Sequence, residues 1–176
     1  MQIVVGCDVE VFKKYYRNSD IHDYFKAVGV ADAIFGELGP VEEAHIRRDP
    51  SHLIVLREGN EIIGHAIWHE ECMDGFSEPG DKEVREALEK LLRGRRDFVE
   101  LHEVWLENRY RGRGYGNKFF EFFEDSVRKK GCDSIVYFTG NPAAIAICRT
   151  RGYKEAMLSF PEKEKWHVFC LPFNQQ

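Results

Sequence analysis

The chain has 176 residues, of which 43% are hydrophobic, so it can bury the core of one ordinary domain without disulfides or metal. Its 30 acidic and 25 basic residues give a net charge of −5, which excludes a general attraction to nucleic acid or to an anionic membrane. The five cysteines are scattered and odd in number, which favours neither a disulfide framework nor a zinc knuckle. We therefore expect one soluble, cytoplasmic domain with reduced thiols and without a signal peptide or membrane span.

The first third of the sequence is predicted to be mostly helical, with breaks at glycines and at the Gly39–Pro40 pair. The expected elements are a short strand at 2–5 and helices near 8–17, 20–28 and 41–48. From His52 onward, two apolar strands joined by a turn at 58–60 predict an antiparallel hairpin.

Residues 73–96 form an insertion longer than a hairpin connection needs. It is predicted to contain a loop and then a helix, whose apolar residues recur at helical spacing: Val84, Leu88, Leu91 and Leu92. The segment either borders a substrate site or presents a solvated helix face.

The second half predicts a strand, a loop and a helix, followed by further strands. A strand at 98–106 precedes the loop, and a stripe of apolar residues predicts a helix of about four turns: Phe119, Phe120, Phe123 and Val127. A right-handed crossover would make the next strand, at 134–138, parallel to the first. The remaining expected elements are a helix from Asn141 to Gly152 and strands at about 153–160 and 165–171, with a turn at 161–164. The predicted class is α/β (α+β), with a mixed, mostly antiparallel central sheet flanked by helices.

The loop YRGRGYGNK places Gly112, Gly114 and Gly116 at alternate positions directly before a helix. This spacing matches neither the G-x-G-x-x-G of a dinucleotide fold nor a P-loop. The glycines let several backbone N–H groups approach a ligand, and the helix N-terminus adds partial positive charge, so the segment suits a phosphate. Arg111 and Arg113 would add fork-shaped donors for a diphosphate. A tight turn with solvated arginines is the alternative that the spacing leaves open.

Three separated motifs resemble the GNAT superfamily of acyl-CoA-dependent N-acyltransferases. Arg111-x-x-Gly114-x-Gly116 matches the family signature R/Q-x-x-G-x-G/A. Upstream, Val104-x-Leu106 followed by Tyr110-Arg111-Gly112 is similar to L-x-V-x-P-x-Y-R-G, with Asn108 where proline is usual. Downstream, Asn141-x-x-Ala144 and then Arg151-Gly152-Tyr153 resemble the segment N-x-x-A-x-x-x-Y-x-K-x-G-F that closes the cofactor cleft.

The resemblance covers about residues 52–171 and implies a single GNAT domain over 1–176, with 1–50 as a helical region on the acceptor side. It implies acetyl-CoA as co-substrate, with the pyrophosphate on the loop amides and the pantetheine arm along the edge of a splayed parallel strand pair. The expected cofactor-binding residues are Val104, Trp105, Leu106, Arg111, Gly112, Arg113, Gly114, Tyr115, Gly116, Asn117, Asn141 and Ala144.

Glu100 and His102 are candidates for proton transfer. A strand has a period of two, so both side chains lie on one face, just upstream of the edge where the resemblance places the thioester. Several family members carry their general base here, so we expect Glu100 to act as base through a water, with His102 as partner or relay. The alternatives are a solvated carboxylate and a satisfied core histidine. The Val104 N–H is the expected donor to the oxyanion.

Cys148 stands where the family usually has a tyrosine. A thiol with an ordinary pKa of about 8.5 could protonate the departing CoA thiolate or even form an acyl-cysteine, so Cys148 is included among the candidate catalytic residues. Alternatively, Cys148 is a small apolar filler, and water or a neighbour such as Tyr137 supplies the proton.

His65, His69 and Glu71 share one face of a predicted strand, which raises the question of a metal site. The Cα atoms of the two histidines would lie roughly 13 Å apart in a strand, too far to share an ion. No metal is therefore expected.

The expected reaction is acetyl transfer from acetyl-CoA to a primary amine by direct attack in a ternary complex, catalysed by a monomer or homodimer. The amine is a small molecule or a protein amine; acidic residues at 37, 42 and 43 either attract a cationic amine or are plain surface. One alternative is a GNAT-fold acyl-CoA sensor or scaffold without transfer activity. Another is a nucleic-acid-binding module built on the glycine-rich loop, which the acidic net charge disfavours. Neither nucleic acid nor membrane is expected as a partner.

Overall fold

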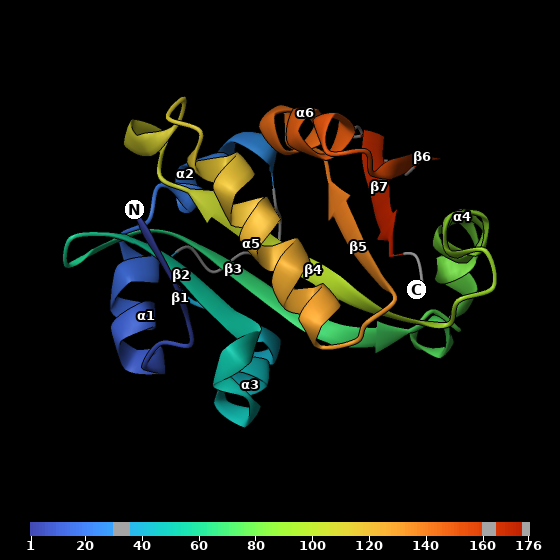
Figure 1. Cartoon of the computed structure of the whole chain (residues 1–176), viewed down its shortest axis with the longest axis horizontal. Helices are drawn as coiled ribbons and strands as arrows, with labels where there is room; N and C mark the ends of the chain where they lie inside the picture. Colours follow the sequence, from blue (N-terminus) through green and yellow to red (C-terminus); the bar gives the residue numbers. More distant parts are fainter. Residues whose placement is uncertain (30–35, 160–164, 174–176) are drawn as a thin grey trace. The chain divides into compact units, whose positions relative to one another are not determined.

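The computed structural model describes residues 1–29, 36–159 and 165–173 (Figure 1). The chain forms two compact units, each described here by itself. The first comprises Met1–Trp68 and Glu103–Phe119, and the second comprises His69–His102 and Phe120–Gln176. The expectation of a single domain over 1–176 stays a prediction.

The strands form one mixed sheet of seven, in the order β1-β2-β3-β4-β5-β7-β6. Their bounds are β1 Gln2–Val5, β2 Leu53–Glu58, β3 Glu61–Cys72, β4 Asp97–Leu106, β5 Ser134–Thr139, β6 Lys154–Ser159 and β7 Lys165–Pro172. Strand β4 pairs with β5 in parallel, whereas the pairs β1–β2, β2–β3, β5–β7 and β6–β7 are antiparallel. The predicted mostly antiparallel sheet with one parallel pair is confirmed.

Six α-helices occur in the part of the chain that the structure describes. They are α1 Val9–Arg17, α2 Ile21–Val28, α3 Pro40–Arg48, α4 Lys82–Leu92, α5 Tyr115–Lys129 and α6 Pro142–Thr150. The sequence supplies their starting signals: Asp8 caps α1 by accepting from the N–H groups of Glu10 and Val11, and α3 begins at Pro40. The predicted helices are confirmed, with boundaries that differ by one or two residues.

The first unit has its own apolar core. Residues from α1, α2, α3 and β2 pack there with Ile67 of β3 and Trp105 of β4, and its fully buried members include Phe12, Ile21, Ile46, Leu53 and Val55. Only glycine fits at position 64 of β3, because a Cβ there would lie 2.5 Å from the carbonyl oxygen of Trp105. Glycine therefore lets β3 approach the end of β4 closely.

The second unit has a separate core, in which α4 packs against β6 and β7. The α4 residues in this core are Ala87, Leu88, Leu91 and Leu92, and the strands contribute Val136, Leu158, Val168 and Cys170. The apolar face of the insertion is thus a core face, and its polar face is solvated. The predicted phenylalanine stripe of α5 is buried as well, including Phe120, Phe123 and Val127.

Strands β4 and β5 pair only over a short length. Their parallel register runs from Val99–Ile135 to Leu101–Tyr137 and ends there. Strand β4 nevertheless continues to Leu106, and β5 continues to pair with β7 as far as Thr139. The parallel pairing is confirmed, and the divergence beyond it stays a prediction.

The turn expected at 161–164 lies outside the described residues. Among the helices that are described, none combines the length and apolarity needed to cross a bilayer. The five cysteines are free thiols, and Cys148 and Cys170 are buried.

Candidate active site

The glycine-rich loop leaves its backbone amides open. Gly112 and Gly114 have φ angles of 75° and 78°, the left-handed region that favours glycine, and a Cβ at either position would meet only open space. Across the described ranges, the N–H groups of residues 112–117 have no protein acceptor. Alternating left-handed residues turn successive N–H groups toward one side, and α5 begins at once at Tyr115. The loop therefore has the geometry of the predicted anion site.

Two glutamates of the β2–β3 hairpin hold this loop. The Tyr110 hydroxyl donates to Glu61 Oε2 at 2.9 Å, and the Tyr115 hydroxyl donates to Glu58 Oε1 at 2.8 Å. Arg109 also pairs with Glu61. Glu58 and Glu61 flank the hairpin turn, so they are distant from the loop in sequence, and no local motif signals the contact.

The two loop arginines contact protein groups. The Arg111 Nε donates to the carbonyl oxygen of Leu106 at 2.9 Å, and its guanidinium lies 4.3 Å from the centre of the Trp105 ring. Arg113 donates to the carbonyl oxygen of Arg109 at 3.2 Å. Both side chains thus fix the end of β4 and the loop, and their role as phosphate donors stays a prediction.

Asn141 acts as the N-cap of α6. Its Oδ1 accepts from the N–H groups of Ala143 at 2.9 Å and Ala144 at 3.4 Å. The side-chain Nδ2 donates to no other group in the described part of the chain. This amide is the group through which Asn141 would contact a cofactor.

Glu100 and His102 come together in the second unit, as their spacing predicts. Glu100 Oε1 lies 3.6 Å from His102 Nδ1, and Glu100 Oε2 lies 3.7 Å from His69 Nε2. The Glu100 side chain is 16% exposed and that of His102 is 38% exposed. Glu100 is therefore half-buried between two imidazoles, and His102 is open to solvent and is not a core histidine.

His65 belongs to a different group of side chains, in the first unit. It is fully buried, its Nε2 lies 2.6 Å from Glu103 Oε1, and its Nδ1 lies 3.3 Å from the Tyr15 hydroxyl. Tyr15 in turn donates to Glu107 at 3.0 Å, and burial raises the pKa of Glu107. His65 and His69 thus have different partners, and the expectation that they share no ion stays a prediction.

Cys148 is fully buried in α6. Burial raises the pKa of its thiol to about 12, and the negative charges of Glu124 and Glu155 add to the effect. Such a thiol is a weaker acid than an ordinary thiol, so it is poorly suited to protonate a departing thiolate. The environment favours the apolar-filler interpretation of Cys148.

Comparison with known proteins identifies the family. Residues 15–153 match the Acetyltransferase (GNAT) family. The chain belongs to the GNAT acetyltransferase family. None of the curated proteins gives a significant sequence match.

Solved structures share the GNAT fold over nearly the whole chain. The Drosophila melanogaster polyamine N-acetyltransferase, which forms N-acetylagmatine, has a TM-score of 0.67 and 13% identity, covering 98% of this chain and 100% of that one. Arylalkylamine N-acetyltransferase 2 of Aedes aegypti has a TM-score of 0.66 and 15% identity, covering 98% and 99%. The yncA protein of Salmonella typhimurium, solved with its cofactor acetyl-CoA, has a TM-score of 0.63 and 17% identity, covering 100% and 95%. The predicted GNAT fold is confirmed.

The open amides of the glycine-rich loop fit the cofactor of this family. N–H groups at a helix N-terminus that have no acceptor among the described residues are suited to a diphosphate, and any larger residue at Gly112 or Gly114 would strain the backbone. The chain is a GNAT-family enzyme whose loop chemistry suits acetyl-CoA.

Proposed function

We propose that this GNAT enzyme acetylates a primary amine by direct attack, with Glu100 as general base and His102 as its partner. The observation that carries the proposal is the position of the half-buried Glu100 carboxylate, 3.6 Å from His102 Nδ1 on the same strand. The next residues of that strand, Val104 to Leu106, carry the first GNAT motif.

Acetyl-CoA supplies the acetyl group as an activated thioester. We propose that the N–H groups of residues 112–117 hold its diphosphate and that the Asn141 amide contacts it. The backbone of Val104 to Leu106 would bind the pantetheine arm, with the Val104 N–H donating to the carbonyl oxygen. Because Arg111 already donates to the Leu106 carbonyl oxygen, it would fix this part of β4 for binding.

An amine must be neutral to attack, so its ammonium form must first lose a proton. Glu100 would accept this proton through a water, and the exposed imidazole of His102 would pass it to solvent. For the leaving thiolate we propose water as the proton source, because the burial of Cys148 makes its thiol a weak acid.

The acceptor is proposed as a primary amine of unspecified class. Of the acidic residues expected to attract a cation, Glu43 is already paired with Lys13 at 3.1 Å and with Arg47 at 2.7 Å. Its charge is compensated, so Glu43 gives no reason to favour a polycation over a protein N-terminus.

The test is CoA release measured with Glu100→Gln against a panel of polyamines, arylalkylamines and peptides. We expect kcat to fall roughly 10²–10⁴-fold while the acetyl-CoA Kd changes little, because the substitution removes only the base. Glu70→Gln, which changes an exposed carboxylate on β3, is the matched control and should retain turnover. An unchanged pH–rate profile in Glu100→Gln would exclude Glu100 as the base.

A second candidate function is an acyl-CoA sensor or scaffold. The buried Cys148 favours it, because this residue replaces the tyrosine that usually provides the proton. Binding of acetyl-CoA without CoA release over the whole amine panel would select this alternative.

A further inference from the structure

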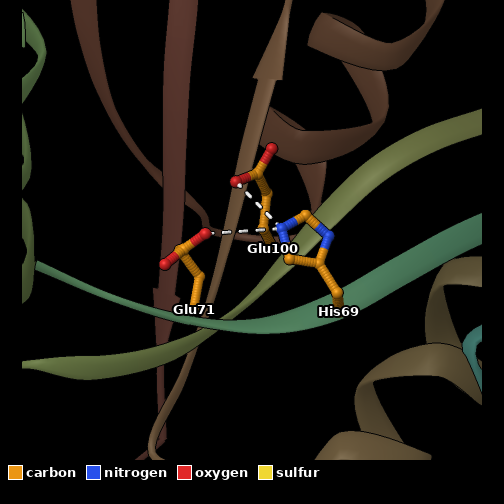
Figure 2. A group of neighbouring side chains, drawn as sticks. All are labelled: His69, Glu71 and Glu100. Atoms are coloured by element: carbon orange, nitrogen blue, oxygen red, sulfur yellow. Dashed lines mark ion pairs between the residues drawn. The ribbon is translucent and has the colours of Figure 1, made fainter. Parts of the chain in front are cut away.

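Three potential metal ligands converge within the second unit. His69 and Glu71 come from β3 and Glu100 comes from β4, and their side chains point toward one another (Figure 2). One nitrogen and two carboxylate oxygens all lie within 4.8 Å of one another. Strand alternation in the sequence predicts that His69 and Glu71 lie on the same face of β3. That Glu100 of β4 lies beside them follows only from the tertiary structure.

The distances suit an ion better than hydrogen bonds. His69 Nε2 lies 3.6 Å from Glu71 Oε2 and 3.7 Å from Glu100 Oε2, and both separations exceed the usual hydrogen-bond length. A protonated His69 has a single Nε2 proton, so it could donate to only one of the two oxygens. Ligands bound tetrahedrally to zinc at about 2.0–2.1 Å lie about 3.3 Å apart, close to these separations.

The only basic side chains paired with the two carboxylates in the described residues are the imidazoles of His69 and His102. In the described parts of the chain, neither Glu71 nor Glu100 forms an ion pair with lysine or arginine. Their side chains are only 29% and 16% exposed, so solvent screens them incompletely. A divalent cation would neutralise both charges, and the partial exposure gives it access.

Neighbouring residues hold the Glu71 carboxylate in its orientation. Its Oε1 accepts from the Cys72 N–H at 2.9 Å, which leaves Oε2 facing His69. A Cβ on Gly75 would lie 2.6 Å from Glu71 Oε1, so glycine leaves the space that the carboxylate occupies. Such supporting contacts are typical of metal sites, where they orient the ligands.

We propose that His69, Glu71 and Glu100 form a binding site for a divalent transition-metal ion of the zinc type, with a fourth position open to water. One imidazole and two carboxylates are ligands that zinc accepts, whereas magnesium favours oxygen ligands in octahedral geometry. If Glu100 is the general base, as proposed above, a bound ion engages its carboxylate and inhibits acetyl transfer.

The test uses the full chain and measures Zn²⁺ binding by competition with a chromophoric chelator, under reducing conditions. We expect one Zn²⁺ per chain, a loss of affinity of about tenfold or more in His69→Gln and in Glu71→Gln, and unchanged affinity in Glu70→Gln. Mg²⁺ should not compete. Equal Zn²⁺ affinity in the wild type and in all three variants would overturn the proposed site.

Cobalt distinguishes this site from the thiols, because Co²⁺ bound to cysteine shows a thiolate charge-transfer band and Co²⁺ bound to nitrogen and oxygen does not. We expect tetrahedral d–d bands without the thiolate band, and a thiolate band that accounts for all bound Co²⁺ would overturn the proposal. Folding of each variant is checked by thermal unfolding without metal.

Binding and catalysis give separate results. Inhibition by Zn²⁺, measured relative to each protein's own metal-free turnover, should be lost in Glu71→Gln and kept in Glu70→Gln. If Zn²⁺ binds as expected while Glu100→Gln keeps full turnover, the metal site stands and the proposed base fails. If Zn²⁺ does not bind while Glu100→Gln loses turnover, the metal site fails and the proposed function stands.

Discussion

At the scale of single residues, Cys148 shows how strongly burial changes the chemistry of a side chain. The thiol of an exposed cysteine has an ordinary pKa of about 8.5, so it can gain or lose a proton at a pH not far above neutral. In α6 the same thiol is excluded from water and lies near Glu124 and Glu155, so its pKa rises to about 12. Its protonated form is small and apolar, which suits the position it fills.

Cys148→Ala is therefore expected to reduce stability more than activity. We expect the free energy of unfolding to fall by about 1–2 kcal/mol, because the substitution leaves a small cavity. Any loss of kcat should be far smaller than the roughly 10²–10⁴-fold loss expected when a general acid is removed. Denaturant unfolding and CoA-release kinetics on the same preparation check both values. A large loss of kcat in a folded Cys148→Ala variant would restore Cys148 as the proton donor.

At the scale of elements, the glycine-rich loop depends on the β2–β3 hairpin of the first unit. The local sequence provides the left-handed glycines and the start of α5, but it does not fix where the loop lies. Hydrogen bonds from Tyr110 and Tyr115 to Glu61 and Glu58 do so. If the loop amides bind the cofactor phosphates, as proposed, their position matters, and these contacts from outside the motif would support binding.

Tyr115→Phe is expected to weaken acetyl-CoA binding without abolishing it. The lost hydrogen bond to Glu58 corresponds to about 0.5–1.5 kcal/mol, or roughly a twofold to twelvefold increase in Kd, because the loop must then be ordered on binding. Isothermal titration with acetyl-CoA measures the change. Ser126→Ala is the control, since it removes a hydrogen bond from a hydroxyl to the Phe122 carbonyl oxygen further along α5, outside the loop, and it should leave Kd unchanged. Equal Kd values in all three proteins would show that the loop needs no such anchor.

Sequence patterns predicted the elements well because each pattern is local. The stripe of Phe119, Phe120, Phe123 and Val127 fixes the buried face of α5, and Asn141 followed by proline fixes the start of α6. The same patterns could not identify Gly64 as a close-contact position, because the atom that a side chain would meet belongs to Trp105, 41 positions further along the sequence. The His69–Glu71–Glu100 cluster was missed for the same reason.

At the scale of the whole molecule, an ion-pair group connects three elements of the second unit. Glu155 of β6 accepts from Arg149 of α6 at 2.9 and 2.7 Å, and it lies 2.5 Å from His167 Nδ1 of β7. The Arg149 guanidinium, followed by the contact with His167, lowers the pKa of Glu155 below its ordinary value of 4.5. The ionised carboxylate is therefore the form that the fold stabilises.

This shift predicts a loss of stability in acid. A carboxyl whose pKa is lower in the folded state contributes its full stabilisation above the ordinary pKa of 4.5, and the contribution is lost as the pH falls through the folded-state pKa. Glu155→Gln should therefore unfold at a lower temperature than the wild type at pH 7, and the difference should shrink below pH 4.5. Thermal unfolding from pH 7 to pH 3 measures this, and a difference that stays constant with pH would contradict it.

The sequence by itself determined the order and type of the elements, the glycine-rich loop before α5 and the family, because helix periodicity, strand alternation and glycine spacing act over a few residues. Only the tertiary structure decided which groups meet: the hairpin glutamates with the loop tyrosines, Arg111 with the end of β4, and Glu100 with His69 and Glu71. The physical reason is that the pKa of a buried thiol, the strength of an ion pair and the coordination of a metal depend on distances between segments far apart in the chain.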